Sequence, residues 1–118
     1  MNFVSGTILT DGKDSQDADS TANICVYTSL GLIARAPCGA GVVARVALQV
    51  KKGLTDLNQP RTFKSRYGSS FVGKAVEKTN VGEREAVRVE VSGQGHYIGR
   101  NTFFSEENDE IGKGFEAI

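Results

Sequence analysis

Apolar side chains recur every three or four positions between residues 39 and 52, which is the spacing of one buried face of an α-helix. Pro37 presets the backbone for helix entry just before this stretch, and two lysines followed by Gly53 are typical of a helix end. The pattern therefore predicts a single helix over residues 39–52. Its buried face is formed by Val42, Val43, Val46, Ala47 and Val50.

Shorter runs rich in β-branched and aromatic residues surround this helix and favour β-strands. They cover residues 6–10, 22–28, 62–67, 70–78, 86–91 and 96–104. Residues 11–21 are polar and predict a surface loop, whereas residues 55–60 form a link that ends at a proline. We expect an α+β fold in which two strands precede one central helix and about four antiparallel strands follow it.

Composition excludes several classes of protein but points to no reactive group. The 118 residues suffice for one domain or a piece of a larger one, and 14 basic residues balance 14 acidic ones. Because there is no basic excess, we expect no nucleic-acid and no membrane partner. Two cysteines are too few for a disulfide framework, so reduced thiols and a cytoplasmic location are expected.

Cys38 is the candidate chemical group, because it stands at the predicted start of the helix. Unpaired backbone amides and the positive end of the helix dipole favour a thiolate there and can hold a carboxylate. Gly39 and Gly41 have no side chain to obstruct an anion. Two alternatives stay open: Cys38 is a small buried cap, or it forms a disulfide with Cys25.

Other polar groups are weaker candidates. His96 is the one histidine, and a lone histidine in a strand is more often structural than an acid or base. The acidic residues 106–110 lack the alternating ligands and the glycine of a calcium loop, so they predict a solvated tail. The cysteines and His96 are not at zinc-ligand spacing, and we expect no metal site.

Several motifs in order along the chain carry a resemblance to a known family. They are Arg35-x-Pro37-Cys38-Gly39-x-Gly41, Ala44-Arg45-x-Ala47, Lys52-Gly53, Gly68-Ser69-x-Phe71-x-Gly73, Ser92-Gly93-x-Gly95-His96-Tyr97-x-Gly99 and Gly114-Phe115. With them, the chain resembles the C-terminal part of the proline racemase family over nearly its whole length. Within the family, its sequence most resembles the trans-3-hydroxy-L-proline dehydratase branch. This resemblance is clearest at residues 6–14, 23–26, 57–59, 63–65 and 89–94.

The resemblance implies a fold and a chemistry. The fold is one lobe of a diaminopimelate epimerase-like or proline racemase fold, an antiparallel β-barrel-like sheet around a central helix, with the active site between two lobes. Racemases and epimerases of this family use one cysteine from each lobe and no cofactor. By position, Cys38 matches the second catalytic cysteine of the family, and Gly39 and Ala40 match the amide pair that binds the carboxylate of a proline or hydroxyproline substrate.

Three departures from the family pattern affect function. Ala34 occupies the position of an aspartate that usually contacts the substrate amine. Cys38 is the racemase and epimerase state, because eukaryotic dehydratases carry threonine there. The first half of the family fold is absent, so residues 1–118 form a C-terminal, single-lobe segment that needs a partner lobe or a homodimer for activity. The alternative is an inactive homologue that serves as a binding or structural protein.

Overall fold

The computed structural model describes residues 3–14, 20–114 and 116 of the chain. Within these residues there is one helix, α1 (Gly39–Lys51), and seven strands. The strands are β1 (Gly6–Leu9), β2 (Thr21–Ala22), β3 (Ile24–Tyr27), β4 (Leu32–Ile33), β5 (Arg61–Lys64), β6 (Ser70–Val81) and β7 (Arg84–Ser92). The α+β class expected from the sequence is confirmed.

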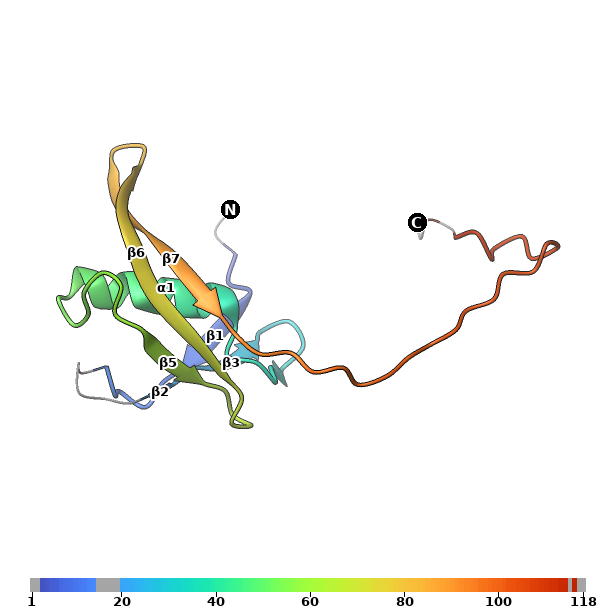
Figure 1. The fold of residues 1–118 in the computed structure, drawn as a ribbon, viewed down its shortest axis with the longest axis horizontal. Helices are drawn as coiled ribbons and strands as arrows, with labels where there is room; N and C mark the ends of the chain where they lie inside the picture. The colour runs from blue at the N-terminus through green and yellow to red at the C-terminus, as the bar shows by residue number, and fades with distance from the viewer. Residues whose placement is uncertain (1–2, 15–19, 115, 117–118) are drawn as a thin grey trace.

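The strands form two open sheets instead of the barrel-like sheet that we expected (Figure 1). One sheet is antiparallel with the order β1-β3-β4. The other has the order β2-β5-β6-β7, and its β2–β5 pair is parallel, so the expectation of a purely antiparallel sheet is also wrong. In the described residues neither sheet closes on itself, because β2 and β7 are edge strands of one sheet and β1 and β4 of the other.

The single strand predicted over residues 22–28 is divided at Asn23. Thr21 and Ala22 pair with β5 in one sheet, whereas residues 24–27 pair with β1 and β4 in the other. The backbone amide of Asn23 donates to the Lys64 carbonyl at 2.8 Å, and the Asn23 side chain is fully buried. A period-two pattern is the same on both sides of such a change of sheet, so the sequence did not reveal it.

The predicted helix is confirmed to within one residue. Lys52 is its C-terminal cap, and Gly53 adopts a left-handed φ of +72°, which glycine tolerates best. Val42 and Val46 are fully buried, as expected. Val43 was placed on the buried face, but it is 38% exposed because it lies one position beyond the contact stripe.

The core lies between α1 and the four-stranded sheet. It consists of Val42, Val46, Phe63 and Ala75, flanked by Val50, Phe71, Val87, Val89 and Val91. Gly73 in β6 lets the helix come close, because a Cβ there would lie 2.7 Å from Val42 Cγ1 and 2.9 Å from Val46 Cγ2. The helix that begins next to Cys38 is thereby fixed on the sheet.

Gly73→Ala is expected to lower the free energy of unfolding by about 1–3 kcal/mol, because the added methyl group overpacks the core. Urea unfolding of the variant and the parent chain measures the difference. Gly82→Ala is a poor control, since Gly82 has a left-handed φ of +62°. Gly95→Ala is the suitable one, because no atom lies within 4 Å of its added Cβ. Equal losses in the two variants would contradict close packing at Gly73.

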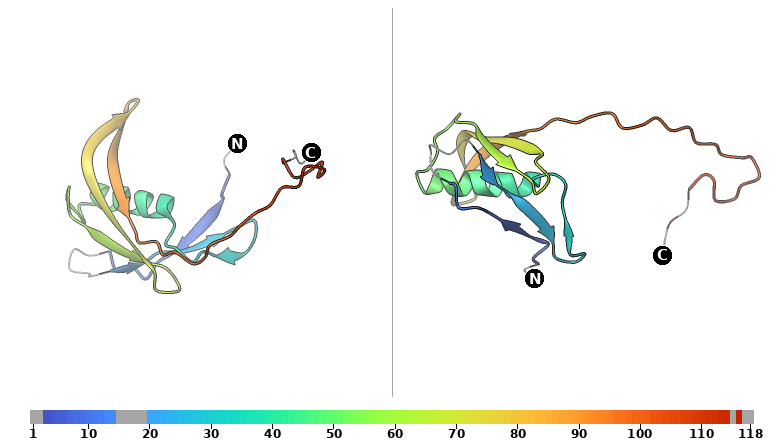
Figure 2. Two further views of the ribbon diagram at one scale, coloured as in Figure 1. Left: turned by 45° about the vertical axis from the view of Figure 1, so that its right-hand side comes forward. Right: turned by 90° about the horizontal axis from the view of Figure 1, so that it is seen from below.

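The strand predicted over residues 96–104 is absent. The chain leaves the sheet after Ser92 and runs away from the body as an extended segment (Figures 1 and 2). The radius of gyration is 19.2 Å, compared with about 13 Å for a compact domain of this size. In the part of the chain that the structure describes, no helix has the length and hydrophobicity needed to cross a membrane.

Candidate functional site around Cys38

Cys38 is the N-cap residue of α1, where the sequence placed it. Its φ of 68° and ψ of 107° lie in a region that residues other than glycine rarely adopt. The first hydrogen bond of the helix runs from the Val42 amide to the Cys38 carbonyl at 3.0 Å. The residue is half-buried.

The amides at this helix end are available to a ligand. Helix geometry leaves the first amides, including those of Gly39 and Ala40, without an acceptor inside the helix. The first turn contains no acidic residue, and Cys38 makes no side-chain capping hydrogen bond. A Cβ added at Gly39 would meet nothing within 4 Å, so open space adjoins the helix end. The arrangement can accept an anion such as a carboxylate.

Three hydrogen bonds to residues outside it hold the segment that leads to Cys38. The Ala34 amide donates to the Cys25 carbonyl at 2.9 Å, the Ser69 hydroxyl donates to the Arg35 carbonyl at 2.6 Å, and the Asn23 side-chain amide donates to the Pro37 carbonyl. Sequence reasoning did not single out Asn23. The available signal was an amide side chain inside an otherwise apolar run, which a buried strand contains only when it has partners.

Arg45 on α1 is the centre of a polar network behind the site. It forms an ion pair with Asp14. Its guanidinium also donates to the Thr21 hydroxyl at 3.0 Å and to the Ala22 carbonyl at 2.5 Å. The Phe63 ring centroid lies 5.2 Å from its Cζ. The network ties the middle of the helix to β2.

This network corrects part of the surface loop predicted over residues 11–21. Asp14 takes part in it, and Thr21 is only 2% exposed. Residues 15–19 of the predicted loop lie outside the described residues. Residues 11–13 are exposed as predicted. At Asp14 and Thr21, however, polar side chains are partners of Arg45, so a polar composition did not imply exposure along the whole segment.

Cys25 on β3 lies against Cys38, and both cysteines are free thiols. Burial is the main cause that raises the pKa of the Cys25 thiol above its usual value near 9.0, and the hydrogen bond with the Cys38 thiol and the charge on it raise the pKa further. Cys25 is 2% exposed, so it is the protonated and protected member of the pair.

Iodoacetamide is expected to alkylate Cys38 faster than Cys25 at neutral pH, because only a thiolate reacts and Cys25 keeps its proton. Deprotonation of Cys25 disfavours the folded state, because its pKa is higher in that state than in the unfolded chain. Its contribution to stability is therefore full below the unfolded pKa and is lost as the pH rises through the folded pKa. Peptide mapping after alkylation at several pH values measures the reaction rates of Cys38 and Cys25. Equally slow reaction of the two cysteines would contradict a reactive thiol at the helix end.

The remaining candidates do not join this site. His96 is exposed on the extended segment after β7, and the described acidic residues 106–110 are exposed as predicted. Among residues 3–14, 20–114 and 116, no three His, Cys, Asp or Glu side chains gather where they could hold a metal ion. Phe115 of the sequence motif lies outside the described residues.

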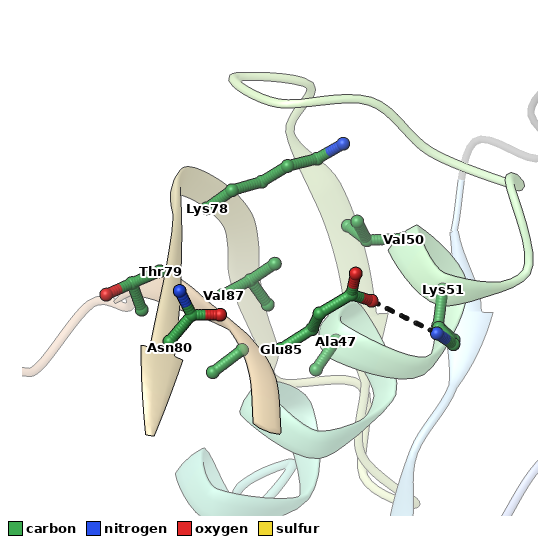
Figure 3. A pocket seen from close by; sticks show the side chains of 9 residues that line it. Ala47, Val50, Lys51, Lys78, Thr79, Asn80, Glu85 and Val87 are labelled. Carbon is green, nitrogen blue, oxygen red and sulfur yellow. Dashed lines mark hydrogen bonds and ion pairs between the residues drawn. The ribbon is translucent and has the colours of Figure 1, made fainter. Parts of the chain in front are cut away.

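A groove lies at the C-terminal end of α1 (Figure 3). Along the helix this is about 18 Å from Cys38. Val50 and Lys51 line its helix side, and residues of the β6–β7 hairpin line the other side. Lys51 and Glu85 close one edge with an exposed ion pair of 3.2 Å. The groove is thus separate from the helix end that carries the thiol.

Comparison with known proteins identifies the family. The chain matches the family described as proline racemase over residues 1–116. This chain belongs to the proline racemase family. The trans-3-hydroxy-L-proline dehydratase of Homo sapiens is 52% identical to this family member over 116 residues, which are 98% of this chain and 32% of that protein. The dehydratase of Colwellia psychrerythraea is 33% identical, with 98% and 32% covered. The chain thus spans about a third of the length of these relatives.

Solved structures of the same family have the same fold. A hydroxyproline epimerase from Agrobacterium vitis, solved with bound trans-4-hydroxy-L-proline, superposes with a TM-score of 0.73 at 24% identity. A probable proline racemase from Agrobacterium radiobacter K84, solved with bound carbonate, gives 0.73 at 23% identity. Each comparison covers 97% of this chain and 32% of the solved one. The expectation of a proline racemase fold is therefore confirmed at the level of the fold.

Proposed function

We propose that this chain is the C-terminal lobe of an enzyme in which Cys38 exchanges the Cα proton of a proline-type substrate. The observation that supports this proposal most is the half-buried Cys38 at the N-terminus of a helix whose first turn contains no acidic residue. The 52% identity to a trans-3-hydroxy-L-proline dehydratase supports a hydroxyproline as the substrate class. Two free thiols support a reducing, cytoplasmic setting.

The chemistry follows from the two groups at the helix end. The Cys38 thiolate forms an S–H bond with the Cα proton, and the electron pair of the broken C–H bond moves toward the carboxyl group. The Gly39 and Ala40 amides hold that carboxylate and stabilise the developing charge. In dehydration the pair then forms the C2=C3 double bond and breaks the C3–O bond, and the hydroxyl takes up the proton that Cys38 accepted and leaves as water. This step uses no cofactor.

The same thiol also suits epimerisation. After a base on the opposite side of the ring has removed the Cα proton, a protonated Cys38 returns a proton to its own face, which inverts the centre. Dehydration needs one proton abstraction at Cα, whereas inversion needs a second acid–base group on the opposite face of the ring. The family resemblance associates a cysteine at this position with racemases and epimerases, and the sequence identity favours the dehydratases. The reaction products decide between the two.

The extended segment supports a complementary lobe as the partner. Tyr97 and Ile98 are 106% and 95% exposed, and Phe103 and Phe104 are each 89% exposed. Soluble proteins seldom leave so many large apolar side chains in water unless another surface covers them. We propose that residues 97–104 pack against the part of the enzyme that corresponds to the other two-thirds of the relatives' length.

Deuterium exchange tests the proposal. The chain is combined with a lobe corresponding to the rest of a relative and incubated in D₂O with trans-3-hydroxy-L-proline, L-proline or trans-4-hydroxy-L-proline. We expect deuterium at Cα or loss of water in the combined sample, and neither with the chain alone. An absence of exchange and of product with all three substrates would overturn the enzymatic proposal.

A variant that combines Phe103→Ser and Phe104→Ser tests whether residues 97–104 pack against the complementary lobe. It is expected to weaken association with the complementary lobe by more than about tenfold, because two large buried rings contribute strongly to an interface. Sedimentation or titration calorimetry measures the change. Val81→Ser, which removes an apolar group that is 70% exposed on the β6–β7 hairpin, is the matched control. Equal binding of the double variant and the control would contradict this role.

A binding or structural protein is the second candidate. Ala34 favours it, because a methyl group cannot pair with the ammonium group of an amino acid substrate. Its backbone amide is already bonded to Cys25, so this residue offers no other donor at the site. Substrate binding without Cα exchange in the combined sample would favour this candidate.

A further inference from the structure

The backbone at Cys38 needs support. Among the described residues, only Cys38 and Asn58 combine a side chain with a positive φ. Asn58 is a residue type that adopts this conformation readily, whereas cysteine is not. A cysteine stays in this conformation only where surrounding contacts prevent relaxation. The contacts of the preceding residue, Pro37, are therefore informative.

Asn23 provides that support through both ends of its side chain. Its Nδ2 donates to the Pro37 carbonyl, directly before Cys38, and its Oδ1 accepts from Arg45 Nη1 at 3.3 Å. Its backbone amide donates to the Lys64 carbonyl at 2.8 Å. One fully buried residue thus joins β5, the turn before α1 and the helix itself.

The packing around Asn23 leaves its amide little freedom to turn. A Cβ added at Gly41 would lie 3.4 Å from Asn23 Nδ2 and 2.8 Å from Ile8 Cδ1. The first turn of α1 is therefore pressed against both β1 and the amide. Cys25, two residues further along the chain on β3, is hydrogen-bonded to Cys38.

We infer that Asn23 is a positioning residue that holds Cys38 in its left-handed conformation at the end of α1, with the thiol beside the helix amides. The role rests on the proposed function, since it gives Asn23 a purpose only where Cys38 is the working thiol. Loss of the bond to Pro37 lets the turn relax and takes the sulfur away from the amides.

Two variants separate this role from general stability in the full 118-residue chain. Asn23→Leu keeps a similar size and removes both polar contacts, whereas Asn23→Asp keeps the acceptor for Arg45 and removes the donor to Pro37. Both are expected to slow alkylation of Cys38 by iodoacetamide at neutral pH by about two- to fivefold, which corresponds to the interaction of one charge with a helix end. The difference should disappear at high pH, where the thiol is ionised in every variant.

Two controls exclude other causes. Val46→Ala destabilises the same helix at a position that does not contact the turn. When each protein is assayed at the same number of degrees below its own thermal midpoint, this variant should be alkylated at Cys38 as fast as the parent. Asn101→Asp adds the same charge on the exposed segment and should also react like the parent. Slowing in Asn23→Asp alone would indicate charge instead of position and overturn the inference, as would equal slowing in Val46→Ala.

The test needs no substrate and no second lobe, so its outcome is independent of the exchange experiment. Slowed alkylation together with an absence of Cα exchange would retain the positioning of Cys38 and reject the enzymatic proposal. Parental alkylation rates together with exchange would reject the role of Asn23 alone. If Asn23→Leu does not fold, Asn23→Ala takes its place, because it also removes both polar contacts and adds no charge.

Discussion

Cys38→Ser in the combined two-lobe enzyme is expected to lower the rate of Cα proton exchange by about 10²- to 10⁴-fold, the usual contribution of a positioned acid or base. A serine hydroxyl is too weak an acid to supply an anion at neutral pH, although it has nearly the same size and can cap a helix. The Gly39 and Ala40 amides stay in place, so KM should change far less than kcat. Initial rates in D₂O over a range of substrate concentrations measure both constants.

Folding is the control for this substitution. The variant should keep the circular dichroism spectrum and the thermal midpoint of the parent chain, because Cys38 is only half-buried and makes no side-chain capping bond. A rate within about twofold of the parent would show that another group moves the proton. A large increase in KM with an unchanged kcat would instead assign Cys38 to substrate binding.

Phe63→Ala is expected to lower the free energy of unfolding by about 3–5 kcal/mol, the largest stability effect in this chain. Phe63 is fully buried, and its ring packs against Gly73 and beneath the Arg45 guanidinium. Removing the ring leaves a cavity between the helix and the sheet and takes away a neighbour of the polar network. Urea unfolding followed by circular dichroism measures the loss.

The matched control for this substitution is Phe104→Ala. Its ring is 89% exposed, so the change in unfolding free energy should stay within about 0.5 kcal/mol in the isolated chain. A loss at position 104 as large as that at position 63 would mean that the extended segment packs on this lobe in solution. That result would also contradict a complementary lobe as its partner.

Local signals sufficed to predict the helix and the position of Cys38. A run of valines at helical spacing, a proline before it and a glycine after it all act within a few residues of each other. The neighbours that fix the cysteine could not be predicted in this way. Asn23 and Ser69 lie next to strands, 15 and 31 residues from Cys38 in the chain, and no periodicity records which carbonyl they bind.

The prediction of a strand over residues 96–104 was wrong for a different reason. Its large apolar residues indicate burial, and they are exposed here because the described residues contain no surface that covers them. A sequence pattern reflects the complete assembly in which it was selected, whereas the structure of one chain shows only that chain. The opposite error occurred at Thr21, a polar residue that we assigned to the surface loop and that is buried beside Arg45.

The parallel pairing of β2 with β5 has a consequence for folding kinetics. The β6–β7 hairpin closes a two-residue turn, but Thr21 must meet Phe63 across more than 40 intervening residues. Long loops close more slowly than short ones, so we expect the hairpin to form early and the β2–β5 contact late. Because Asn23 follows β2 directly, the thiol site would acquire its shape only in the last step of folding and lose it in the first step of unfolding.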